Sequence, residues 1–172
     1  MEKTIKELID ISQYSGNRAD YTQGGGGNTS VKNLDKGLML IKASGYRLKD
    51  ISMDTAFVAV DQDKIFNYYN TVDVSVEKDY EKETGLLIVK HFKELGLNPS
   101  EINMVLCGGH GPFAWGETAA KSVYNGTVME EICKMALNTL ALNPNANELP
   151  SYIVDKHYLR KHGPNAYYGQ GK

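Results

Sequence analysis

Residues 24–45 read GGGGNTSVKNLDKGLMLIKASG, and this stretch decides the local fold of the chain. Four consecutive glycines lose too much backbone entropy to form the interior of a helix or strand, so Gly24–Gly27 predict a loop. The runs 29–32 and 38–42 predict two strands, joined by the short turn between them. The stretch therefore predicts a β-hairpin that follows a glycine-rich loop and ends at the breaker Ala43-Ser44-Gly45.

Outside the hairpin, the spacing of apolar residues predicts four helices and further strands. The helices are expected over residues 2–13, 80–95, 118–140 and 152–162. Short apolar runs predict a strand over 56–60 and a buried strand over 102–107. Apolar and polar residues alternate between residues 72 and 77, which suits a strand with one wet face. Together these elements predict an α/β fold.

The composition is that of an ordinary globular protein. The 172 residues suit one domain, taken as 1–172, and 41% hydrophobic residues argue against disorder. A net charge of −2 gives no overall attraction to nucleic acid or to an anionic membrane. The first residues do not form a signal sequence, no apolar run reaches membrane-spanning length, and Cys107 and Cys133 form no disulfide framework. We therefore expect a soluble, cytoplasmic protein.

The glycine loop and the end of the second strand are candidates for binding a phosphate. Gly27 and its neighbours would let backbone N–H groups close on an anion. Asn28 adds an amide donor, Lys42 a positive charge, and Ser44, beside Gly45, a hydroxyl. A glycine-rich hairpin corner with a surface lysine is the alternative. No Walker or GxGxxG motif is present, so nucleotide binding has no support.

Two groups of residues in the second half of the chain offer other chemistry. His110 follows the predicted buried strand between glycines, at what is expected to be a strand-to-helix turn, and it could reach a metal or be structural. Zinc needs three or four ligands, and no nearby HxH, HxxxH or cysteine pair supplies the others. His157 could act as an acid or base, and a tyrosine such as Tyr168 could deliver a proton. A basic solvated helix face with a frayed tail is the alternative.

Several of these segments resemble a known family. The segments HGPFAWG (110–116), DKHYLRKHG (155–163) and AYYGQ (166–170) resemble L-ribulose-5-phosphate 4-epimerases of the class II aldolase/adducin family. The segments GGGGNTSVK (24–32) and IKASGYRLKDI (41–51) look like the phosphate-loop segments of class II sugar-phosphate aldolases and epimerases.

The resemblance implies a three-layer α/β/α sandwich around a mainly antiparallel sheet, in a homotetramer with active sites between subunits. It implies that the substrate phosphate is bound by Gly27, Asn28, Lys42, Ser44 and Gly45. It further implies that His110 is a zinc ligand, and that His157 and Tyr168 assist proton transfer in the adjacent subunit.

The reaction that the resemblance implies converts L-ribulose 5-phosphate to D-xylulose 5-phosphate. Zinc would assist a retro-aldol cleavage, and the aldehyde would re-add through its other face. The alternatives are a class II sugar-phosphate aldolase, and a non-catalytic sugar-phosphate-binding or scaffold member without the metal site. An internally deleted product without a selected activity is a further alternative.

The chain departs from the family pattern in one place. The family has an HxH pair of metal ligands on a central strand, whereas residues 56–80 contain no histidine. The histidines of the chain are His91, His110, His157 and His162. Two of the usual three zinc-binding histidines are therefore absent. The resemblance also predicts that central strands of the sandwich are missing near residues 70–78, which would expose sheet edges.

Overall fold

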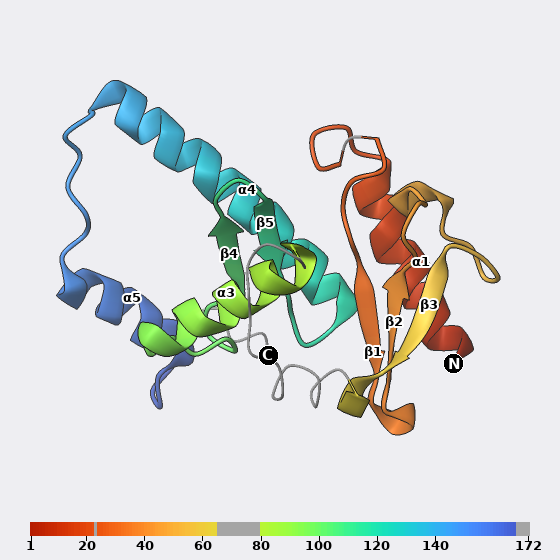
Figure 1. Cartoon of the computed structure of the whole chain (residues 1–172). Coiled ribbons are helices and arrows are strands. Elements are labelled where there is room, and N and C mark those ends of the chain that lie inside the picture. Colours follow the sequence, from red (N-terminus) through yellow and green to blue (C-terminus); the bar gives the residue numbers. More distant parts are fainter. Residues whose placement is uncertain (23, 65–79, 168–172) are drawn as a thin grey trace. The chain divides into compact units, whose positions relative to one another are not determined.

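The computed structural model describes residues 1–22, 24–64 and 80–167 of the chain (Figure 1). Its contacts divide the chain into two compact units, Met1–Glu131 and Ile132–Lys172. The strand expected at residues 72–77 lies outside the described residues. The region near 70–78, where central strands were expected to be missing, lies outside them as well. The single domain expected over 1–172 stays a prediction.

Helix α1 (Glu2–Gly16) confirms the helix predicted near the start of the chain. Glu2 lies in its first turn, where a carboxylate favours the helix dipole, and it pairs with Lys6 at 2.7 Å. Leu8 and Ile11 lie on the buried face of the helix. The helix therefore has one apolar face, and it packs this face against the sheet that follows it in sequence.

The predicted hairpin is confirmed and extended by a third strand. The elements of this sheet are β1 (Ser30–Asn33), the 3-10 helix η1 (Leu34–Lys36), β2 (Leu38–Lys42) and β3 (Phe57–Asp61). Strand β2 is central, because it pairs antiparallel with β1 on one side and with β3 on the other. The turn closes where the Asn33 side chain accepts a hydrogen bond from the Lys36 N–H and where Gly37 adopts a φ of 60°.

The core of the first unit lies between α1 and this sheet. Alternation along β2 places Leu40, which is 1% exposed, on the face covered by α1, opposite Val31 of β1. The 3-10 helix η2 (Leu48–Asp50) closes the core from the side of α1. The buried apolar residues of this core are Leu8, Ile11, Val31, Leu40, Leu48, Ile51 and Ala56.

Two helices and a second small sheet complete the first unit. The elements are α3 (Tyr80–Glu94), β4 (Met104–Cys107), β5 (Gly111–Ala114) and the part of α4 (Ala119–Leu142) up to Glu131. Strands β4 and β5 form an antiparallel hairpin. Phe92 of α3 packs edge-on against Trp115 at 5.6 Å between ring centroids, and Trp115 Nε1 donates to Pro99 O at 2.7 Å.

Two expectations for this region are wrong. The strand predicted over 102–107 is not buried, since Leu106 is 60% exposed. His110 was expected at a turn from a strand into a helix, but it lies in the turn between two strands. The exposure of β4 depends on what packs against it, which an apolar run does not reveal. The turn at His110 forms because Gly109 and Gly111 adopt positive φ angles, so the chain reverses into a hairpin instead of continuing into α4.

The α/β class is confirmed by these elements. Every strand pair among the described residues is antiparallel, as predicted, but the strands form one sheet of three and one of two. This arrangement is compatible with the predicted family fold. The three-layer sandwich stays a prediction.

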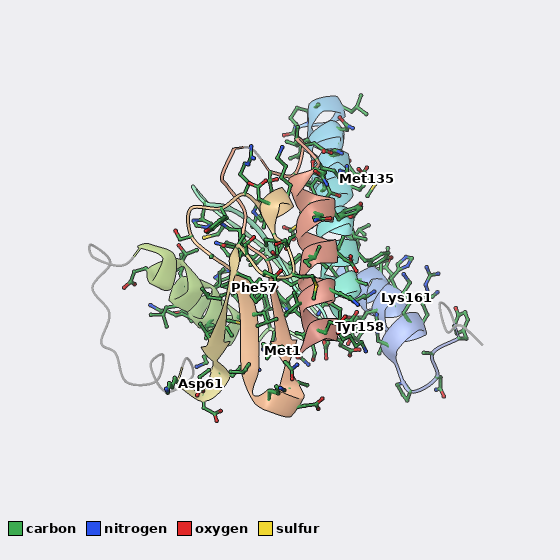
Figure 2. All side chains as sticks on the ribbon, turned by 90° about the vertical axis from the view of Figure 1, so that its right-hand side faces the viewer. Met1, Phe57, Asp61, Met135, Tyr158 and Lys161 are labelled. Atoms are coloured by element: carbon green, nitrogen blue, oxygen red, sulfur yellow. The ribbon has the colours of Figure 1, made fainter. Side chains whose placement is uncertain are left out.

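The second unit contains the rest of α4 and helix α5 (Ser151–His162), which confirm the last two predicted helices. The apolar side chains of this part of α4 are exposed, with Met135 at 60% and Leu140 at 51% (Figure 2). Of the helices in the described ranges, none combines the length and apolar composition that a bilayer crossing requires.

Leu40→Ala should test the position of the core. Removing a fully buried leucine side chain is expected to lower the free energy of unfolding by about 2–5 kcal/mol, measured by urea denaturation. Leu34→Ala is the matched control, because Leu34 is 80% exposed and its loss should change stability by less than about 0.5 kcal/mol. Equal effects of the two substitutions would contradict this core.

Candidate functional site

The β1–β2 register brings the two predicted phosphate-binding segments together. Ser30 pairs with Ile41, and one residue further the Lys42 N–H donates to Thr29 O at 3.0 Å. Asn28 directly precedes Thr29, so it lies beside the end of β2 where Lys42 begins the segment to Gly45. The corner at which the glycine loop enters β1 is therefore the same corner at which β2 ends.

Lys42 is not the surface lysine that the alternative interpretation required. Its position two residues after Leu40 places its stem on the core side of the sheet, and the residue is only 8% exposed. Its Nζ donates to Tyr46 O at 2.9 Å and to Ala43 O at 3.3 Å. An ammonium group has three N–H donors, and these two bonds to described residues use two of them.

The glycines at this corner adopt backbone conformations that other residues rarely adopt. Gly27 and Gly45 adopt φ angles of 83° and 85°, which side chains rarely tolerate. A Cβ at Gly27 would lie 2.8 Å from the Leu48 and Thr22 side chains, so the backbone must pass close to the core here. Asn28, Ser44 and Gly45 are exposed. Their polar groups are therefore available to a ligand at the surface.

A buried serine supports the start of β1. Ser12 is fully buried on α1, and its Oγ lies 2.6 Å from Thr29 Oγ1. This pair fixes the residue next to Asn28 to the helix. Ser12 falls within the helix predicted over residues 2–13, and its pattern alone predicted no further role. The signal that marks it is a small polar residue on an otherwise apolar helix face.

A pocket of about 300 Å³ lies beside the glycine loop. Arg47 lines it, but its guanidinium donates to both carboxylate oxygens of Asp50, at 2.7 and 3.2 Å. The hydrogen bond from Arg47 lowers the pKa of Asp50 below its ordinary value. Arg47 is therefore neutralised locally, and Lys49 is the other cation at the pocket. The lining residues are Gly16, Asn17, Ala19, Thr22, Gly24, Arg47, Leu48 and Lys49.

The predicted metal ligand His110 lies away from any cluster of suitable donors in the described ranges. The residue is exposed in the β4–β5 turn, and its ring stacks on Phe113 at 5.2 Å between centroids. Among residues 1–22, 24–64 and 80–167, no group of three His, Cys, Asp or Glu side chains could hold a metal ion. Zinc takes at least three protein ligands, so these residues of one chain do not fit the expected zinc site.

The two predicted proton-transfer residues lie in the second unit or beyond the described residues. His157 is exposed on α5. Tyr168 lies outside the described residues. Before it, Tyr167 is 76% exposed, and its N–H donates to Arg160 O at 3.0 Å. The roles given to His157 and Tyr168 therefore stay predictions.

Comparison with known proteins supports the resemblance over about half of the chain. Residues 58–137 match the sequence model of the Class II Aldolase and Adducin N-terminal domain. This chain is similar to the class II aldolase and adducin family. It is also 44% identical over 95 residues to L-ribulose-5-phosphate 4-epimerase UlaF from Salmonella paratyphi C (strain RKS4594) and from Salmonella choleraesuis (strain SC-B67). The matched part is 55% of this chain and 41% of each relative.

The match to the class II aldolase and adducin domain covers only part of the predicted site. It includes His110, but it begins after the hairpin corner and ends before α5. The chain spans less than half the length of these two relatives. The prediction of a phosphate site at the hairpin corner therefore rests on the corner's own geometry and on the resemblance of its segments, and not on the family match.

Gly27→Ala should show whether the corner needs a glycine. The added Cβ is expected to meet Leu48 and Thr22 and to strain a positive φ, which should lower the free energy of unfolding by more than about 1 kcal/mol. Gly25→Ala is the control, because nothing lies within 4 Å of its added Cβ and its φ is not in the left-handed region. Thermal denaturation of both variants measures the difference, and tolerance of alanine at Gly27 would contradict the close approach.

Proposed function

We propose that this chain binds a ketose phosphate by its phosphate group, as a sugar-phosphate epimerase or aldolase of the L-ribulose-5-phosphate 4-epimerase type. The observation that carries the proposal is the hairpin register, which places the glycine loop next to Lys42 and the segment that follows it. The matches to the class II aldolase and adducin domain and to the UlaF epimerases support the sugar-phosphate class.

Each residue of the corner has a role in this proposal. The Lys42 ammonium supplies the positive charge. Beside its bonds to Ala43 O and Tyr46 O, its third N–H would donate to a phosphate oxygen. Asn28 and Ser44 donate from an amide and a hydroxyl on either side. Gly45 has open space beside its backbone, so an anion can approach its N–H group closely, and Gly27 allows the loop its tight path along Leu48 and Thr22.

The catalytic part of the proposal needs more than the described residues of one chain. A divalent metal, held in part by His110, would supply Lewis-acid chemistry when bound. His110 is the only residue that we assign toward it. We propose that turnover occurs in a homo-oligomer, with His157 and Tyr168 of an adjacent subunit beside the substrate. L-Ribulose 5-phosphate is the proposed substrate.

A non-catalytic sugar-phosphate-binding protein is the second candidate. The observation that favours it is the lack of a three-donor cluster around His110 within the described ranges. The two candidates share the phosphate-binding corner and differ in metal content and turnover. Metal analysis of the purified protein together with an epimerase assay separates them. One metal per chain with turnover supports the enzyme, whereas phosphate-ester binding without either supports the binding protein.

Lys42→Met should weaken binding of L-ribulose 5-phosphate by about 10- to 100-fold, because a charged hydrogen bond is lost while the buried stem keeps its packing. Isothermal titration calorimetry measures the dissociation constant. Free L-ribulose, which lacks the phosphate, should bind weakly and equally to both proteins.

Lys36→Met is the matched control, because Lys36 lies in η1 at the other end of the hairpin. It should bind the phosphate ester like the unaltered chain. The proposal fails if Lys42→Met is folded and binds normally, or if the unaltered chain does not distinguish L-ribulose 5-phosphate from L-ribulose.

A further inference from the structure

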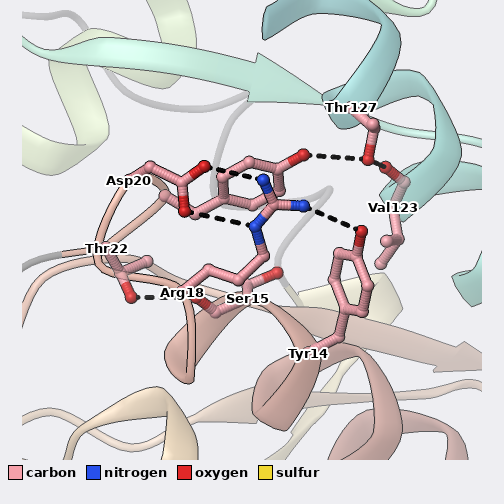
Figure 3. Close-up of polar contacts among 8 residues, drawn as sticks. Tyr14, Ser15, Arg18, Asp20, Thr22, Val123 and Thr127 are labelled. Atoms are coloured by element: carbon pink, nitrogen blue, oxygen red, sulfur yellow. Dashed lines mark hydrogen bonds and ion pairs between the residues drawn. The ribbon is translucent and has the colours of Figure 1, made fainter.

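A compact polar cluster lies where α1 gives way to the glycine loop (Figure 3). Arg18 is at its centre. Its Nη1 donates to Tyr14 Oη at 3.2 Å, and its Nε and Nη2 donate to the Asp20 carboxylate at 3.2 and 2.6 Å. The guanidinium carbon also lies 4.0 Å from the centroid of the Tyr21 ring. Arg18 therefore holds Tyr21 by its aromatic face while the carboxylate of Asp20 fixes the guanidinium.

Tyr21 is held at its other end by α4. Its hydroxyl donates to Thr127 Oγ1 at 3.0 Å, and Thr127 Oγ1 in turn donates to Val123 O at 3.0 Å within the helix. The Tyr21–Thr127 bond joins residues 106 positions apart in sequence, and both belong to the first unit. The loop after α1 is thus attached to a second helix by one part-buried hydrogen bond.

Thr22, the residue after Tyr21, connects this link to the glycine loop. The Thr22 N–H donates to Arg18 O at 3.0 Å, and its Oγ1 donates to Ser15 O at 3.1 Å. The Thr22 methyl group lies 2.8 Å from the position that a Cβ on Gly27 would take. Tyr21 and Thr22 therefore support both the entry to the glycine loop and its last glycine, which directly precedes Asn28.

We propose that Tyr21, held by Arg18 and Thr127, is a positioning residue for the phosphate-binding loop. The phosphate ligand of this loop rests on the proposed function, whereas the contacts that hold Tyr21 do not. Tyr21 does not contact the ligand; it sets the path of Gly24–Asn28 by fixing the residues on which that loop rests. The bond that matters is the one to Thr127, because the Arg18–Asp20 pair is exposed and its charges are screened.

Substitutions at the two ends of this bond test the proposal. Tyr21→Phe keeps the ring over Arg18 but removes the hydroxyl, and Thr127→Val removes the acceptor at nearly constant shape. Each should lower the backbone ¹⁵N order parameters of residues 24–28 and raise the dissociation constant for L-ribulose 5-phosphate by about two- to tenfold. The double variant should be no worse than the more affected single variant, because both remove the same bond.

Two controls separate positioning from a general loss of stability. Thr127→Ser keeps the hydroxyl and should retain the unaltered order parameters and affinity. Thr139→Val makes the same change as Thr127→Val elsewhere on α4, where the Thr139 hydroxyl donates to Met135 O at 2.9 Å. It should leave residues 24–28 and the affinity unchanged, even where the melting temperature falls.

The order parameters test the positioning role, and the affinity for the phosphate ester tests the proposed function. Unchanged order parameters at residues 24–28 in folded Tyr21→Phe and Thr127→Val would overturn the positioning role, whatever the affinity. Lowered order parameters in a chain whose unaltered form binds no phosphate ester would uphold the positioning role and overturn the proposed function. Equal changes in Thr139→Val and Thr127→Val would show a general structural effect and would also overturn the proposal.

Discussion

The candidate site depends on the antiparallel register of β1 and β2, which ends in the hydrogen bond from the Lys42 N–H to Thr29 O. A shift of one residue would move Leu40 and Lys42 to the other face of the sheet, because side chains alternate along a strand. Leu40 would then leave the core, and Lys42 would lose the carbonyls of Ala43 and Tyr46. The burial of one leucine thus fixes the position of the lysine beside the glycine loop.

Much of this corner could be predicted from the sequence. The four glycines, the two strands and the turn at Gly37 are local signals, and local signals are strong when several agree. The burial of Lys42 could not be predicted, because it depends on α1 covering that face of the sheet. Ser12, Tyr21 and Thr127 were missed for the same reason, since their partners lie 17 or 106 residues away.

The surroundings of His110 could be predicted less well from the sequence. The apolar run before it indicated a strand, and β4 is there, but periodicity does not reveal what covers a strand. Glycines on both sides of His110 predicted that the imidazole has room to reach a metal. They instead allow a hairpin turn that leads into β5. The motif carries the family resemblance, while the donors that a metal would need are not brought to it by the described residues of one chain.

The short sequence distance between the two halves of the corner has a kinetic consequence. Asn28 and Lys42 are separated by a single tight hairpin, so bringing them together closes only a small loop and costs little chain entropy. Proteins rich in such local contacts fold faster than proteins dominated by distant pairings. The strand contact between Lys42 and Thr29 therefore needs only its own turn of chain, whereas the path of Gly24–Asn28 also depends on Thr127 of α4, 106 residues beyond Tyr21.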